Sequence, residues 1–141
     1  MQEKIPLVIG LGITGRSLVN YLASLHEEII IIEDSIDNSL LNDVKPPNLK
    51  LDINPPINED LLAKVSTIYI SPGIPNDHEI FSYASMCNIH ISSDIQEFIQ
   101  LNNSKKILVT GTNGKTSTCL MIKRLFDTFL PDLKTLVLGN I

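Results

Sequence analysis

Apolar residues in this chain form short runs that alternate with stretches of helical spacing. The runs at 5–9, 29–32 and 67–70 contain no charged position, as is typical of strands buried on both faces of a parallel sheet. Between the first two runs, apolar residues repeat every three or four positions, which predicts an amphipathic helix. The pattern therefore indicates an α/β fold that begins strand, helix, strand. The residues of the helical stripe are Leu18, Val19, Leu22, Ala23 and Leu25.

The rest of the first hundred residues predicts shorter elements. Asn76 and Glu79 are spaced as a capping box before a helix that ends at Asn88, a residue suited to a left-handed cap. Ser93 and Asp94 are expected to cap the last helix, and Asn102 begins a linker. Residues 1–103 are thus predicted to form a Rossmann-like parallel sheet domain. Its further elements are a weak strand at 49–53 within a loop from Ser35 to Pro56, a short helix from Asn58 through Val65, a strand at 89–91 and a helix at 95–101.

From Lys105 the alternation of strand and helix starts again. A strand is expected at 105–110, a helix at 115–129 and a second strand at 135–138. The apolar stripe of that helix is Leu120, Met121, Leu125 and Phe129. Residues 104–141 are therefore predicted to be the first βαβ unit of a P-loop ATPase domain, truncated before the rest of its sheet. Its uncovered side is expected to favour self-association.

The first strand leads into Gly10-Leu11-Gly12-Ile13-Thr14-Gly15, which has the spacing G-x-G-x-x-G. A strand, this turn, a helix and a second strand ending in Glu33-Asp34 make a mononucleotide-binding βαβ unit. The acidic pair follows the glycines by about 20 residues, where a ribose hydroxyl is held in such folds. The pattern says only that backbone approaches a phosphate or a packed helix, so it does not by itself imply NAD.

A second glycine turn runs from Gly111 to Thr116 with the sequence G-T-N-G-K-T. Glycines there allow backbone N–H groups to point at an anion, and the helix that starts near Lys115 adds its dipole. Lys115 would reach the β- and γ-phosphates of ATP, and the Thr116 hydroxyl would bind Mg²⁺. The usual G-x-x-x-x-G-K-[ST] pattern has a glycine where this chain has Val109. The alternative is an ordinary strand-to-helix turn with an exposed lysine.

Composition and charge limit the partners. The formal net charge of −5 argues against a general binder of nucleic acids or membrane surfaces, because few cations are available to neutralise phosphates. No apolar run approaches the ~18 residues of a membrane span, and no signal peptide is recognisable, so a cytoplasmic protein is expected. Cys87 and Cys119 fit no metal spacing and are expected to be reduced structural thiols.

Taken together, the two glycine turns resemble those of the Mur ligase family of peptidoglycan synthesis, and in particular its D-glutamate-adding members. The motifs that carry the resemblance are Gly10 to Gly15, Ser71-Pro72-Gly73-Ile74-Pro75, Asp94-Ile95-Gln96-Glu97-Phe98, Gly111 to Ser117, and Gly139-Asn140-Ile141. The resemblance implies an ATP-dependent ligase that uses Mg²⁺, phosphorylates the carboxylate of UDP-N-acetylmuramoyl-L-alanine and joins it to the amine of D-glutamate.

The resemblance also implies roles for individual residues. Lys115 and Thr116 are expected to be catalytic, with Thr116 on the metal, and either Glu33 or Asp34 is expected to hold the uridine. Family members often have an arginine where this chain has Ser35. The implied UDP-sugar site comprises Gly12, Ile13, Thr14, Gly15, Glu33, Asp34, Ser71, Pro72, Gly73 and Asn140, and the implied ATP site comprises Gly111, Thr112, Asn113, Gly114, Lys115, Thr116 and Ser117.

Three interpretations of the whole chain remain open. The first is a ligase fragment that is inactive alone, because further metal ligands, a carbamoylated lysine and the amino-acid-binding domain of the family have no counterpart before Ile141. The second is a Rossmann-like module that binds NAD. The third is a naturally truncated, non-catalytic relative, which the coding region past Ile141 would separate from the first.

Overall fold

A computed structural model describes residues 4–34 and 49–139 of the chain. The chain divides into two compact units, Met1–Leu101 and Asn102–Ile141. The boundary falls within two residues of the predicted one at 103.

The first unit is built on a five-stranded sheet in the order β3-β2-β1-β4-β5. All four neighbouring pairs of strands run parallel, which confirms the predicted Rossmann-like class. The weak strand predicted at 49–53 forms at one edge of the sheet. The strands are β1 (Ile5–Ile9), β2 (Glu28–Ile32), β3 (Lys50–Ile53), β4 (Val65–Ile70) and β5 (His90–Ser92).

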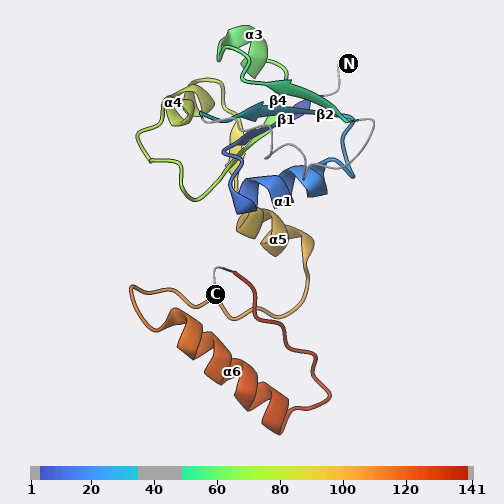
Figure 1. Ribbon diagram of the computed structural model, residues 1–141, viewed down its shortest axis with the longest axis vertical. Helices are drawn as coiled ribbons and strands as arrows, with labels where there is room; N and C mark the ends of the chain where they lie inside the picture. Colours follow the sequence, from blue (N-terminus) through green and yellow to red (C-terminus); the bar gives the residue numbers. More distant parts are fainter. Residues whose placement is uncertain (1–3, 35–48, 140–141) are drawn as a thin grey trace. The chain divides into compact units, whose positions relative to one another are not determined.

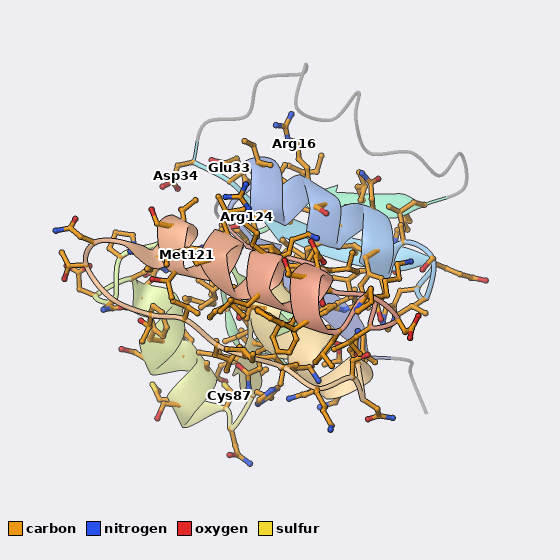
Figure 2. The ribbon with its side chains drawn as sticks, turned by 90° about the horizontal axis from the view of Figure 1, so that it is seen from below. Arg16, Glu33, Asp34, Cys87, Met121 and Arg124 are labelled. Atoms are coloured by element: carbon orange, nitrogen blue, oxygen red, sulfur yellow. The ribbon has the colours of Figure 1, made fainter. Side chains whose placement is uncertain are left out.

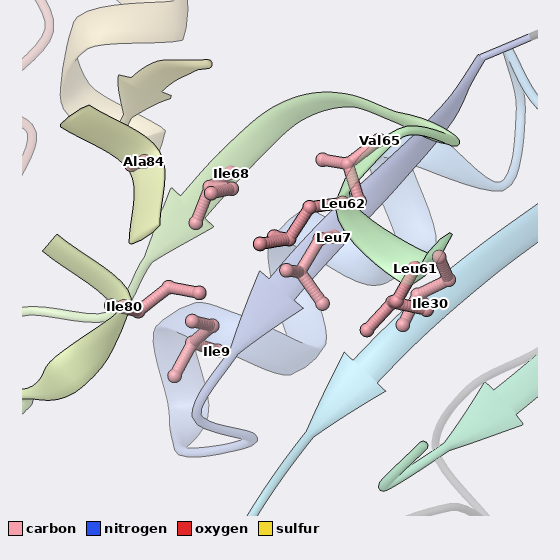
Figure 3. Packing of buried hydrophobic residues seen from close by; sticks show 9 residues of the cluster. All are labelled: Leu7, Ile9, Ile30, Leu61, Leu62, Val65, Ile68, Ile80 and Ala84. Carbon is pink, nitrogen blue, oxygen red and sulfur yellow. The ribbon is translucent and has the colours of Figure 1, made fainter. Parts of the chain in front are cut away.

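Helices cover both faces of this sheet (Figure 1). On one face, α1 (Ile13–Leu22) packs on β1 and β2, and α5 (Asp94–Leu101) contacts α1. On the other, α3 (Glu59–Leu62) and α4 (Glu79–Met86) close a core that Figure 3 shows from nearby. The nine buried residues of that core are Leu7, Ile9, Ile30, Leu61, Leu62, Val65, Ile68, Ile80 and Ala84.

The helix ends test the predicted caps. The Asn58 side chain accepts a hydrogen bond from Leu61 N at 2.9 Å, so α3 begins as predicted, but it ends at Leu62, short of the predicted end at Val65. The predicted capping box at Asn76 is wrong. A turn closed by His78 N and Pro75 O takes up Asn76, and His78 instead caps α4 by accepting from Ile80 N at 3.2 Å.

The end of α4 agrees with the prediction, whereas the end of α1 does not. Asn88 has φ 51°, which confirms the left-handed residue expected after α4. At the end of α1, the predicted apolar stripe includes Leu25, which is wrong. The helix ends at Leu22, and the chain turns at Ser24 and Leu25. Leu25 is therefore 57% exposed.

In the second unit, α6 (Lys115–Phe129) has the predicted bounds. The strands predicted at 105–110 and 135–138 do not form: both segments are without secondary structure and pair with no strand of the described residues. A strand exists only through hydrogen bonds to a neighbour, whereas a helix satisfies its own backbone. No described residue of this unit is buried, and Leu125 of α6 is 58% exposed.

Within 4–34 and 49–139, no helix has both the length and the apolar character that crossing a membrane requires.

Candidate functional site

The strand order reverses between β1 and β4, and this reversal locates the first candidate site. Helix-bearing connections leave a parallel sheet in opposite directions at such a point, which opens a crevice beyond the carboxyl ends of the strands. Ile9 and Ile70 are register partners at those ends. The glycine turn therefore follows β1, and Ser71-Pro72-Gly73 follows β4, at the same carboxyl end of the parallel strands.

The three glycines of the first turn have three different environments. Gly10 has φ +88°, a left-handed conformation that favours glycine. A Cβ on Gly15 would lie 1.9 Å from the carbonyl oxygen of Gly10, so α1 can pack this closely only without a side chain there. A Cβ on Gly12 would meet nothing within 4 Å. Folding therefore requires Gly10 and Gly15, and the space at Gly12 is open to a ligand.

Ser71 contacts the glycine turn directly. Its hydroxyl donates to the carbonyl oxygen of Gly10 at 2.9 Å, and its backbone N–H donates to the carbonyl oxygen of Ile9 at 3.0 Å. Pro72 and Gly73 follow on the exposed side. A Cβ on Gly73 would also meet nothing within 4 Å, so this wall of the crevice has room for a ligand.

The first turn of α1 faces the same end of the sheet. Gly12 is its N-cap, no side chain caps the helix, and no acidic residue lies in its first turn. Ile13 is 83% exposed and Thr14 is half-buried. The free N–H groups and dipole of such an end attract a phosphate, with the Thr14 hydroxyl as a further donor.

Glu33 and Asp34, which sequence alone leaves as equal candidates, differ in the structure. The Glu33 carboxylate accepts a hydrogen bond from the backbone N–H of Leu11, inside the glycine turn. Asp34 is exposed. Figure 2 shows both beside the end of α1 that carries the half-buried Arg16. Glu33 is the acidic residue fixed on the turn.

Asn54 is a residue that sequence reasoning missed. It follows β3 with φ 51°, and its side chain makes two hydrogen bonds of 2.8 Å to the backbone of Glu33. Asn54 reads in the sequence as a turn residue before Pro55. Only the pairing of β2 with β3 brings it to Glu33.

The second candidate site is the turn before α6. Gly111 and Gly114 have φ values of +145° and +77°, so both glycines of the motif adopt conformations that other residues avoid. The Lys115 ammonium donates to the carbonyl oxygens of Gly111 and Thr112, which folds the side chain back over the turn. The remaining predicted residues, Asn113, Thr116 and Ser117, are exposed in the loop and the first turn of α6.

One tyrosine near the first site has a perturbed pKa. Burial raises the pKa of Tyr69 on β4 to about 12, helped by the charge and hydrogen bond of Glu97 on α5 and, less, by Tyr21 on α1. With this pKa, Tyr69 stays neutral at physiological pH, and its side chain is 7% exposed. It joins β4 to α5 behind the crevice.

Asn140 lies outside the described residues, as do Ser35 and most of the predicted loop that follows it. Cys87 and Cys119 are free thiols. No cluster of three His, Cys, Asp or Glu side chains that could hold a metal occurs in the described parts of the chain.

Residues 4–93 match the family model of the Mur ligase MurD-like N-terminal domain. The curated relatives include three proteins named UDP-N-acetylmuramoylalanine--D-glutamate ligase. That of Alkaliphilus oremlandii is 31% identical over 146 residues, which cover 100% of this chain and 32% of the relative. That of Lachnospira eligens is 29% identical, and the match covers 100% of this chain and 31% of the relative. That of Buchnera aphidicola is 32% identical, and the match covers 96% of this chain and 30% of the relative. The chain spans about a third of the length of these relatives.

Among solved structures, a similar one is the crystal structure of MGS-M5, a lactate dehydrogenase enzyme from a deep-sea metagenome library. The match covers 67% of this chain and 38% of the dehydrogenase chain, at 10% sequence identity and a TM-score of 0.45.

Proposed function

The chain belongs to the MurD-like Mur ligases, and we propose that its first unit binds the UDP part of UDP-N-acetylmuramoyl-L-alanine. The observation that carries the proposal is the open space at Gly12, at the point where the strand order reverses. A diphosphate seated there would accept hydrogen bonds from the N–H groups of Gly12, Ile13 and Thr14. Gly15 serves the site through packing, because its missing side chain lets α1 approach β1.

The uridine end of the ligand would lie toward β2. We assign its hydroxyl or imide donors to the Glu33 carboxylate, which is already held at the glycine turn by Leu11 N. Asp34 is exposed and takes a secondary role. Ser71, Pro72 and Gly73 would form the opposite wall, and Asn140 is proposed from the family resemblance alone.

The second unit would contribute the phosphate loop of an ATP site. Gly111 to Ser117 would surround the phosphates, and Lys115, now on loop carbonyls, would move to the transferring group. The exposed Thr116 hydroxyl suits Mg²⁺, which prefers oxygen ligands and keeps several waters and phosphate oxygens. The metal supplies charge neutralisation when it is bound with ATP.

In the whole protein, these two sites would serve one reaction. The γ-phosphoryl group of ATP would pass to the alanyl carboxylate of the UDP-sugar. The amine of D-glutamate would then attack the acyl phosphate, forming an amide and releasing phosphate. The chain spans only about a third of its relatives, so the groups that bind D-glutamate are assigned to no residue.

Calorimetric titration of the 141-residue chain with UDP, UDP-N-acetylmuramoyl-L-alanine and NAD tests the first site. Both uridine ligands should bind, and NAD should not. Gly12→Val should abolish binding while the domain stays folded, because the new side chain occupies only the space reserved for the ligand. Tighter binding of NAD would replace this function with the dinucleotide-binding alternative.

A naturally truncated, non-catalytic relative would bind UDP equally well, so binding does not exclude it. Reading the coding region past Ile141 distinguishes that alternative. A stop codon at that point in the native gene would favour the non-catalytic relative.

A further inference from the structure

The ladder of backbone hydrogen bonds between β2 and β3 ends in an unusual way. In a parallel pair, donors alternate between the strands. Asn54 N donates to Ile31 O at 2.8 Å, so the next bond would run from Glu33 N to the backbone carbonyl of Asn54. Instead, the backbone turns at Asn54, and its side-chain oxygen accepts from Glu33 N at 2.8 Å. The side-chain nitrogen also donates to Glu33 O at 2.8 Å. One amide therefore fixes both polar groups of the Glu33 backbone.

This anchoring reaches the glycine turn through the Glu33 side chain. Leu11 is fully buried, so its N–H requires an acceptor, and the Glu33 carboxylate supplies it. The contacts thus run from Asn54 to the Glu33 backbone, then to the Glu33 carboxylate, and finally to the turn that carries Gly12. Glu33 lies one residue beyond the end of β2, where strand pairing alone no longer holds it.

We propose that Asn54 is a positioning residue of the UDP site, which holds the Glu33 carboxylate against the glycine turn in the orientation that receives the uridine. The inference rests on the proposed function for its ligand, and on the hydrogen bonds of Asn54 and Glu33 for its geometry. It predicts a larger effect on the nucleoside half of the ligand, which Glu33 borders, than on the diphosphate half, which Glu33 reaches only through the glycine turn.

The chain offers a matched control. Asn88 has the same φ of 51° as Asn54 but follows α4, after its C-cap Cys87. Glycine adopts this conformation readily, so Asn54→Gly and Asn88→Gly both preserve the local backbone. Only the first removes hydrogen bonds to Glu33. A difference between the two variants therefore reports the amide contacts and not the turn.

The first measurement needs no ligand. In NMR spectra of the 141-residue chain, the Leu11 amide proton should resonate downfield and exchange slowly because a carboxylate accepts it. Asn54→Gly should move this signal upfield and accelerate exchange, whereas Asn88→Gly should leave it unchanged. An unchanged Leu11 signal in Asn54→Gly would overturn the proposal.

The second measurement separates the two halves of the ligand. Asn54→Gly should weaken UDP binding by roughly 5- to 10-fold, as expected for the loss of about one net hydrogen bond, and should weaken binding of inorganic pyrophosphate by clearly less. In a Glu33→Ala background, the same change should have no further effect. Equal losses for UDP and pyrophosphate, or additive losses in the double variant, would contradict a role through Glu33.

The two measurements test separate claims, so one claim can fail while the other holds. If the unaltered chain binds no UDP, the proposed function fails and the ligand role of Asn54 falls with it. The Leu11 signal still decides whether Asn54 positions Glu33.

Discussion

The hydroxyl of Ser71 donates to the carbonyl oxygen of Gly10 at 2.9 Å, which joins the ends of β4 and β1 across 61 residues of sequence. The same Ser71 oxygen lies 3.1 Å from the place where a Cβ on Gly15 would stand. Strand β4, the glycine turn and the first turn of α1 are therefore packed as one assembly. Gly12, in the middle of the turn, takes no part in this packing.

The glycine turn gives a prediction about stability. Gly15→Ala should lower the free energy of unfolding by about 2–3 kcal/mol, because the methyl group would overlap the Gly10 carbonyl and force α1 away from the sheet. Gly12→Ala should change it by less than about 0.5 kcal/mol, since nothing lies within reach of the new methyl group. Urea denaturation followed by circular dichroism measures both. Equal destabilisation by the two variants would contradict the separate roles.

Tyr69 gives a prediction about pH. Its pKa is raised from 10.0 to about 12 by burial and by Glu97, so the folded chain keeps a proton that the unfolded chain releases. The stabilisation is complete below pH 10 and is lost as the pH rises from 10 to 12, by up to about 2 kcal/mol. Lysines also titrate in this range, so the comparison is with Tyr69→Phe. That variant should show a shallower fall in the free energy of unfolding between pH 9 and 12.

The exposed face of α6 gives a prediction about association. Leu125 is 58% exposed on a unit with no buried described residue, and such surface favours contact between copies. Leu125→Gln should weaken self-association by roughly tenfold or more, given the free energy of burying a leucine side chain. Leu25→Gln changes an equally exposed leucine of the first unit and serves as the control. Sedimentation velocity at several concentrations measures the effect, and equal effects of both variants would contradict the assignment to α6.

The features predicted correctly from sequence depend on short-range rules. The buried strands follow from continuous apolar runs, which need no knowledge of distant contacts. The sequence assigns Gly15 to the UDP-sugar site, and its packing against Gly10 becomes visible only in the structure. α6 was placed to the residue because Gly114 fixes its start and Pro131 limits its end.

The features that were missed depend on long-range contacts. Asn54 acts through a neighbouring strand that pairs with β2, and no local pattern distinguishes it from an ordinary turn residue. His78 became the cap of α4 because a turn at Pro75 moved the helix start. The segments at 105–110 and 135–138 have strand-like sequences but no strand partner among the described residues, and sequence pattern alone does not reveal that.

Lys115 gives a prediction about nucleotide binding. With Mg²⁺ present, the 141-residue chain should bind ATP weakly. Lys115→Ala should lower the affinity for ATP about tenfold relative to the unaltered chain, because a charge-assisted contact to phosphate is lost. Lys123→Ala is the matched control on α6, since Lys123 pairs with Asp127 at 2.5 Å. Titration calorimetry distinguishes them. If both variants bind ATP as the unaltered chain does, the turn at Gly111 to Thr116 is an ordinary helix start with an exposed lysine.

The last prediction is that the 141-residue chain does not turn over ATP in the ligation reaction. In-line phosphoryl transfer needs charge and metal ligands around the transferring group, and it needs the acceptor held close. The loop at Gly111 to Thr116 provides one wall, and the described residues hold no acidic cluster that would provide the other. Phosphate release should be measured with ATP, Mg²⁺, UDP-N-acetylmuramoyl-L-alanine and D-glutamate, beside a chain extended past Ile141 and with the full-length Alkaliphilus oremlandii relative as positive control. Turnover only in the longer chains would support the ligase assignment. Turnover by the 141-residue chain that requires D-glutamate and disappears in Lys115→Ala would show instead that this segment is catalytically sufficient.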